Sequence, residues 1–223
     1  MALIVNLETA TTNCSVTVAR DGKTVSVREH NSASYSHSEQ LHNFIKEALE
    51  EASLSFSDLD AIAVSKGPGS YTGLRIGVSA AKGLCFALDL PLISTPTLYC
   101  MALQKKVDSG IIIPLLDARR MEVYAGVFDA SYTELAATKA VIIQEDTFLE
   151  FAEQEKVFLI GSGAEKCKDI LQHPNFIFDP SIVPTATTMS QHSFEKFLSS
   201  DFENVAYFEP YYLKDFILQQ KKA

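Results

Sequence analysis

The sequence predicts an α/β protein of two unequal lobes, each built on a mixed β-sheet with covering helices. The first half of the chain alternates strand-like and helix-like segments in the order βββαβαβ, and a parallel return within one sheet requires a crossover helix. A second cycle of strands begins at Ile111. With 223 residues, of which 47% are apolar and 21% charged, the chain can bury a substantial core.

The first half opens as a meander of three strands, expected at residues 3–7, 14–19 and 24–29, with Asp21 and Gly22 as a turn. Ser36 and Glu39 then have the spacing of a capping box, and apolar residues follow at the helical period up to Ala52. The rest of this half predicts a strand at 60–65, a helix at 74–88, a short strand around Leu92 and a helix after Thr97.

The second half repeats this plan in a degenerate form. Strands are expected at 111–116, 122–128, 141–143 and 157–160, and helices at 147–154, after Gly163 and after Ser190. The lobes join near residues 104–110. The predicted domains are therefore 1–105 and a reduced lobe at 106–223, with packing of the last helix on the first lobe as an open alternative.

Charge and cysteine content restrict the function. The formal net charge is -9, which has the wrong sign for a protein that grips a phosphate backbone through its general field, so a nucleic-acid role must be indirect or confined to a local basic patch. The four cysteines lie far apart without a CxxC pair and are expected to be reduced core thiols. Neither a basic leader nor a membrane-length apolar run is evident, so we expect a cytoplasmic protein.

The most informative segment is KGPGSYTGLRIGVSAAKGL, residues 66–84. Its glycines at 67, 69 and 73 allow positive φ or a close approach, and the loop leads into a helix whose first amides attract anions. The segment lacks both the Walker signature and the GxGxxG spacing. Phosphate contact and a tight structural turn remain two open interpretations.

Small residues recur along the helix of this segment. Gly73, Gly77 and Ala81 lie at four-residue intervals, and Gly83 adds another residue that helices tolerate poorly. Because an interior glycine costs about 1 kcal/mol relative to alanine, a close neighbour should compensate. We expect a second helix there, either from the same chain or from a partner.

Polar residues at two strand junctions are further candidates. Glu8, Thr9 and the threonines at 11 and 12 could hold the metal and phosphates of a nucleotide, or cap a turn through local hydrogen bonds. The charges at 117, 119, 120 and 122 form either a binding edge or a solvated turn. His37 and His42 are five residues apart and diverge on a helix, so no metal pair is expected.

Five segments that span nearly the whole chain resemble the TsaB/YeaZ family: IVNLETATTNCSV, SHSEQL, KGPGSYTGLRIGVSAAKGL, DARRMEVY and PYYLK. The glycine segment is shared with the catalytic paralogue TsaD, whereas DARRMEVY and PYYLK favour TsaB. One departure is Met121, where the family commonly has glycine, which puts a close backbone approach at that turn in doubt. The resemblance implies a reduced member of the actin, Hsp70 and sugar kinase fold, with two ribonuclease H-like lobes.

The resemblance also implies a function. TsaB is a required, non-catalytic dimerisation subunit that pairs with TsaD, and the ATPase TsaE joins them. TsaD carries the metal and transfers threonylcarbamoyl to N6 of the adenosine at position 37 of ANN-decoding tRNAs. TsaB forms a homodimer in isolation, through the region it offers to TsaD, and meets tRNA only through the complex. No intrinsic cofactor is implied, with ATP or ADP at the junction with TsaD as an open alternative.

Carried onto this chain, the resemblance gives two sets of site residues and neither a catalytic residue nor a metal ligand. The partner interface is expected at His37, Gln40, Leu41, Phe44, Ile45, Tyr71, Leu74, Gly77, Val78, Ala81 and Lys82. Candidate phosphate or nucleotide contacts are Glu8, Thr9, Thr11, Gly67, Gly69, Thr72 and Arg75. The alternative function is an independent ATP-dependent small-molecule kinase or carbamoyltransferase of the same fold. A metalloprotease is not supported by the histidine spacing.

Overall fold

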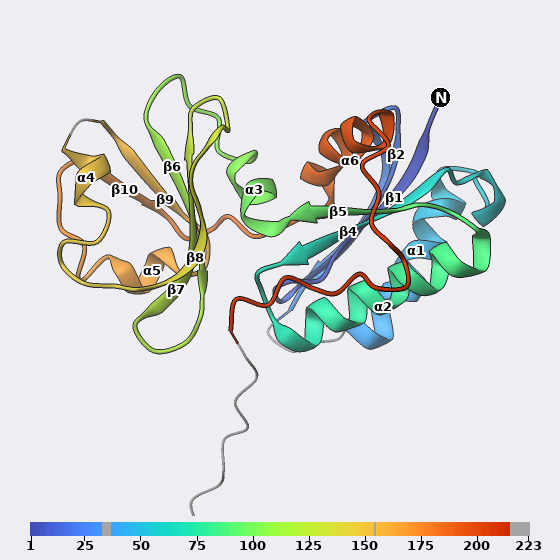
Figure 1. Cartoon of the computed structure of the whole chain (residues 1–223), viewed down its shortest axis with the longest axis horizontal. Helices are drawn as coiled ribbons and strands as arrows, with labels where there is room; N and C mark the ends of the chain where they lie inside the picture. The colour runs from blue at the N-terminus through green and yellow to red at the C-terminus, as the bar shows by residue number, and fades with distance from the viewer. Residues whose placement is uncertain (33–36, 154, 215–223) are drawn as a thin grey trace, which may run out of the picture.

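The computed structural model describes residues 1–32, 37–153 and 155–214, which form two lobes side by side (Figure 1). Each lobe contains a five-stranded mixed sheet, in the orders β3-β2-β1-β4-β5 and β10-β9-β6-β7-β8. The predicted α/β architecture with two mixed sheets is therefore confirmed.

The first sheet begins with the predicted meander. Strands β1 (Leu3–Glu8), β2 (Asn13–Arg20) and β3 (Lys23–Asn31) pair antiparallel, while β4 (Ala61–Gly67) runs parallel to β1 and β5 (Leu92–Pro96) runs parallel to β4. Every residue of β1 is buried because the strand is central and covered on both faces. The carboxyl ends of β1, β4 and β5 lie at one edge of this sheet, where ligands of parallel sheets commonly bind.

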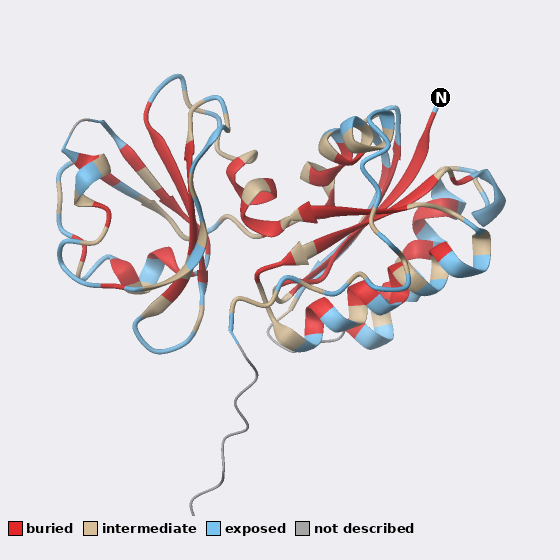
Figure 2. Ribbon diagram, viewed as in Figure 1, coloured by how far each residue is buried: buried red, intermediate tan, exposed pale blue. Residues whose placement is uncertain are grey.

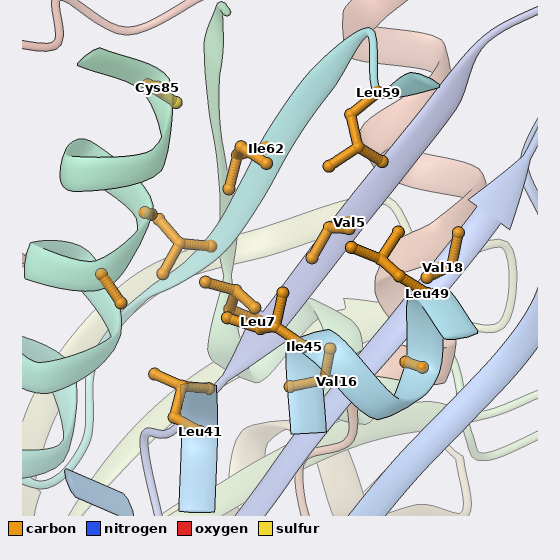
Figure 3. Packing of buried hydrophobic residues seen from close by; sticks show 14 of the residues in the cluster. Val5, Leu7, Val16, Val18, Leu41, Ile45, Leu49, Leu59, Ile62 and Cys85 are labelled. Carbon is orange, nitrogen blue, oxygen red and sulfur yellow. The ribbon is translucent and has the colours of Figure 1, made fainter. Parts of the chain in front are cut away.

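Helices α1 (His37–Glu51) and α2 (Tyr71–Leu88) cover one face of this sheet. Leu41 and Ile45 of α1 pack on Val5 and Leu7 of β1, as Figure 3 shows. The helical stripe predicted from the sequence is thus the buried face of α1, and exposed residues occupy its other side (Figure 2). Ser36, the predicted first residue of the capping box, lies outside the described residues.

The opposite face carries α3 (Thr97–Ala102) and α6 (Met189–Leu198). Short 3-10 turns lie at Phe56–Asp58 and Ala186–Thr188. Helix α3 also joins the lobes: Cys100 packs with the first sheet, whereas Leu98 and Met101 pack with Ile112 of the second. Because α6 returns to the first sheet, the first lobe is assembled from both ends of the chain.

The second sheet contains β6 (Ile111–Asp117), β7 (Glu122–Asp129), β8 (Glu134–Ile142), β9 (Val157–Ile160) and β10 (Phe176–Asp179). Two differences from prediction stand out. Strand β8 starts at Glu134 rather than at residue 141, because its alternating small and polar residues give a weak apolar signal at a sheet edge. Strand β10 was not predicted, since four residues between Pro174 and Pro180 carry almost no pattern.

Two one-turn helices, α4 (Leu149–Ala152) and α5 (Ala164–Cys167), cover the second sheet. Helix α4 is shorter than the helix predicted at 147–154. All four cysteines are buried and free, as expected of core thiols. Within the described ranges, no helix is long and apolar enough to cross a bilayer.

The last described segment, residues 203–214, is called the strap below. It starts with a bridge from the Glu203 amide to the Leu92 carbonyl at 2.8 Å. The strap then follows α2, where the Lys82 ammonium donates to the carbonyls of Ala206 and Phe208 at 3.2 and 2.9 Å. Figure 1 shows it running beside α2 and ending next to the second lobe.

Candidate functional site

The glycine loop after β4 is packed directly against the turn between β1 and β2. The Ser70 amide donates to the Ala10 carbonyl at 2.7 Å, and the Thr9 hydroxyl donates to the Gly73 carbonyl at 2.8 Å. A Cβ atom at Gly69 would lie 2.5 Å from the Ala10 oxygen, and one at Gly73 only 2.1 Å from the Thr9 oxygen. Glycine is therefore required at both positions so that two backbones can meet.

The small-residue face of α2 continues this contact. A Cβ atom at Gly77 would lie 2.3 Å from the Thr9 hydroxyl oxygen, whereas one at Gly83 would meet nothing within 4 Å. The expectation that Gly73 and Gly77 accommodate a second helix, from this chain or from a partner, is therefore corrected. Their close neighbour is the β1–β2 turn of the same chain.

Glu8 ends β1 beneath this contact and is fully buried. One carboxyl oxygen accepts from the Ala10 amide at 2.6 Å, and the other has no hydrogen-bond partner among the described residues. Burial raises the pKa of Glu8 to about 7, although the Ala10 amide and the Ser65 hydroxyl partly oppose the shift. The Ser65 hydroxyl itself bonds to Thr97 at 2.6 Å. A carboxyl group that titrates near neutrality thus lies under the glycine loop.

The structure does not gather the candidate nucleotide contacts around a common space. Glu8, Thr9 and Gly67 are buried, and their polar groups serve the turn and the loop. Thr72 and Arg75 instead lie exposed on α2. A phosphate could reach Glu8 and Thr9 only by separating the loop from Ala10, so these residues do not fit a nucleotide as they are arranged here.

The strap binds the other side of the glycine loop. The Tyr211 amide donates to the Lys66 carbonyl at 2.7 Å, and the ring centroids of Tyr71 and Tyr212 are 5.0 Å apart. Arg75 lies 4.2 Å from the centroid of the Tyr71 ring and donates to the Tyr212 hydroxyl at 3.3 Å. The segments KGPGSYTGLR and PYYLK, distant in sequence, are therefore in contact. Lys66 and residues of the strap, including Glu203 and Glu209, line a groove of about 480 Å³.

The strap ends at the turn between β6 and β7, residues 117–122, which is called the arginine turn below. Lys214 forms an ion pair with Glu122 and lies 5.9 Å from the centroid of the Tyr124 ring. From α5, the Lys166 ammonium donates to the Asp117 carboxylate at 2.8 Å and to the carbonyls of Arg120 and Glu122 at 2.9 and 2.6 Å. DARRMEVY and PYYLK are thereby joined.

The arginine turn has an unusual backbone. Arg119 and Arg120 have φ angles of +69° and +51°, in the left-handed region, whereas Met121 does not. The two carboxylates of the predicted charge cluster are paired, with Lys166 and Lys214, and the two arginines are exposed. Sequence reasoning missed both lysines, although the PYYLK ending was a signal for Lys214.

The residues predicted at the partner interface divide into two groups. Most are buried in the first lobe, namely His37, Leu41, Ile45, Leu74, Gly77, Val78 and Ala81. The remainder are partly exposed, namely Gln40, Phe44, Tyr71 and Lys82. The buried group is covered by the lobe itself and can support an interface from beneath, and the interface stays a prediction.

The prediction missed Phe86, which lies on α2 with 86% of its surface exposed. A signal was available, because Phe86 falls outside the apolar stripe formed by Leu74, Val78 and Cys85.

The two histidines of the first helix do not form a metal pair. The His37 ring lies 2.6 Å from the Thr11 carbonyl, while His42 is exposed. Within the described part of the chain, no group of three or more His, Cys, Asp or Glu side chains could hold a metal ion.

Comparisons with known proteins match two related proteins, TsaD and TsaB. A family model described as "TsaD: tRNA N6-adenosine threonylcarbamoyltransferase" matches residues 30–215. The Escherichia coli "tRNA threonylcarbamoyladenosine biosynthesis protein TsaB" is 28% identical over 98% of this chain and 97% of its own length. A Pseudomonas aeruginosa crystal structure, described as similar to peptidase YeaZ, has a TM-score of 0.83 and 25% identity over 96% of this chain and 100% of that one.

A more distant neighbour defines the wider fold. The activator of 2-hydroxyisocaproyl-CoA dehydratase from Clostridium difficile, solved with bound ADPNP, has a TM-score of 0.50 and 11% identity over 90% of this chain and 96% of that one. The predicted actin-like fold is therefore confirmed.

The glycine contacts predict opposite effects for two alanine substitutions in α2. Gly83→Ala should raise the free energy of unfolding by about 1 kcal/mol, because the methyl group meets nothing and alanine favours the helix. Gly73→Ala should lower it by about 2 kcal/mol or more, because the methyl group overlaps the Thr9 carbonyl. Urea unfolding of both variants checks this, and two changes of the same sign would contradict the assignment.

Glu8 predicts a pH dependence of stability. Its pKa is raised from 4.5 to about 7 in the folded protein, so its contribution is present below pH 4.5 and is lost as the pH rises through 7. Glu8→Gln removes this loss. The free energy of unfolding of the variant minus that of the wild type should increase by roughly 2 to 3 kcal/mol between pH 5 and 8. A difference that is constant with pH would show that Glu8 is not buried in its uncharged form.

Proposed function

The chain belongs to the TsaB/YeaZ family of tRNA threonylcarbamoyladenosine biosynthesis proteins, and on this premise we propose that it is a non-catalytic subunit that pairs with TsaD. In this proposal TsaD transfers threonylcarbamoyl to N6 of the adenosine at position 37 of ANN-decoding tRNAs, and TsaE joins the pair. This chain completes and stabilises the assembly, and it meets TsaD through its first lobe.

The observation that carries the proposal is the closed contact between the glycine loop and the β1–β2 turn. The Ser70 amide and the Thr9 hydroxyl, which would otherwise be available to a phosphate, are bonded within the chain at 2.7 and 2.8 Å. An independent ATP-dependent enzyme would need these groups for its substrate. Their internal use supports a structural role for a loop that the family shares with TsaD.

The outer face of α2 supports a protein-binding role. Gly83 and Phe86 are neighbours on the outer face of the helix, because residues three positions apart are adjacent on a helix surface. Phe86 is 86% exposed, and Gly83 leaves open space beside it. An exposed aromatic side chain next to a glycine suits a closely packed partner helix. We therefore place the TsaD contact on this face rather than on the buried residues of the sequence-based prediction.

Phe86→Asp tests the interface directly. The variant should weaken the complex with TsaD at least tenfold, because a carboxylate replaces an apolar anchor, while the melting temperature changes little for so exposed a position. The matched control is Leu198→Asp. Leu198 is 67% exposed and ends α6 on the opposite face of the first sheet. Titration calorimetry with TsaD measures both, and full binding by the Phe86 variant would reject this face.

Reconstitution tests the division of labour. Modified adenosine should form only when TsaD, TsaE and this chain are all present, and omission of any one should abolish it. The isolated chain should not turn over ATP, and Thr72→Ala should leave the reconstituted activity unchanged. Transfer of threonylcarbamoyl by this chain alone, or ATP turnover that Thr72→Ala abolishes, would instead establish an independent enzyme.

A further inference from the structure

Cationic side chains lie at both ends of the strap on an acidic protein, although the strap itself also carries Glu203 and Glu209. The chain has a net charge of -9, yet neither Arg119 nor Arg120 lies within ion-pair distance of a carboxylate among the described residues. Lys66 and Arg75, at the other end of the strap, also have no ion pair in the described ranges. Four cations without ion pairs in the described ranges therefore lie at the two ends of the strap, although others, such as Lys106 and Lys156, are exposed elsewhere.

The two arginines are held in position by a dedicated clamp. Left-handed φ angles are unfavourable for arginine, and such strain persists only where the surroundings fix it. Lys166 supplies that constraint with three hydrogen bonds to the turn, and its side chain is only 19% exposed. The clamp uses the main-chain carbonyls of the turn and the Asp117 carboxylate, and it leaves both arginines exposed.

Exposed aromatic side chains continue the surface along the strap. Tyr207 is 84% exposed and Tyr211 is 44% exposed, and the ring of Tyr212 packs in a tilted arrangement against Tyr71 beside Arg75. The Lys214 ion pair with Glu122 fixes the end of the strap against the arginine turn. Cations interleaved with exposed aromatic rings are typical of surfaces that bind single-stranded nucleic acid, where the cations contact phosphates and the rings stack on bases.

We propose that the arginine turn and the strap bind RNA, by contacts to the phosphates and bases of an unpaired loop in the tRNA substrate. This inference rests on the proposed function, since the assembly must bring tRNA to this chain. The overall negative charge confines the contact to this local surface. Bidentate guanidinium groups suit phosphates, and tyrosine rings add base stacking that an acidic peptide would not use.

The test replaces both arginines by residues that favour the left-handed backbone. Arg119→Asn with Arg120→Gly removes two charges and relaxes the strain, so folding should be retained or improved. The matched control is Lys106→Gln with Lys156→Gln. Both lysines are exposed and lie at the opposite end of β6, in the connection before this strand and beside its first residue.

Fluorescence anisotropy measures the affinity of unmodified tRNA for the complex with TsaD at several salt concentrations. The arginine variant should bind at least tenfold more weakly, and the slope of log affinity against log salt should fall in magnitude by about 1.4, for two single-strand phosphate contacts. The lysine control should stay within twofold of the wild type. Arg119→Lys with Arg120→Lys should recover part of the affinity because it restores the charge.

Three results would overturn the inference. The first is an unchanged tRNA affinity of the arginine variant. The second is an equal loss of affinity in the lysine control, which would indicate only a general charge effect, and the third is failure of the arginine variant to bind TsaD, which would make the turn a protein contact. If even the wild type does not bind TsaD, the proposed function fails separately. In that case tRNA binding is measured with the isolated chain, and the inference holds only if the arginine variant again binds more weakly than the wild type while the lysine control does not.

Discussion

The close contact between the glycine loop and the β1–β2 turn is the constraint on which the rest of the structure depends. It joins the ends of β1 and β4 to the start of α2 and excludes side chains at Gly69, Gly73 and Gly77. The cost of placing glycines inside a helix is offset by the close approach that they permit. The same contact buries Glu8 and occupies the Thr9 hydroxyl and the Ser70 amide. Groups that could bind an anion therefore form hydrogen bonds within the chain.

The strap extends this contact to the second lobe. It contacts the glycine loop through Tyr211 and Tyr212 and the arginine turn through Lys214, and thus connects segments separated by up to 145 residues in the chain. Three sequence motifs that mark the family therefore meet on one side of the molecule. This convergence gives the strap a structural role, and it also places the exposed arginines and tyrosines on a common surface.

Much of the fold could be predicted from the sequence, and the reasons for the failures are physical. Strand β9 was predicted with its observed limits because Val157–Ile160 is a short apolar run, and α1 was recognised by its helical stripe. Strand β8 was shortened because it depends on pairing with β7 rather than on its own pattern. The contacts of the site were harder to predict. Gly73 was identified as a position of close approach, but its neighbour is Thr9, which lies 64 positions away and leaves no periodic signal. Phe86 was not predicted because helical periodicity identifies the buried apolar stripe, and Phe86 lies outside that stripe.

The central claim is that the loop donors serve the chain itself. Hydrogen exchange of the Ser70 amide, followed by NMR in the isolated protein with and without ATP, tests it most directly. The amide should be strongly protected without nucleotide, because it donates to the Ala10 carbonyl, and ATP should leave its rate unchanged. Rapid exchange in the free protein, slowed by ATP, would show instead that the loop is open and awaits a phosphate.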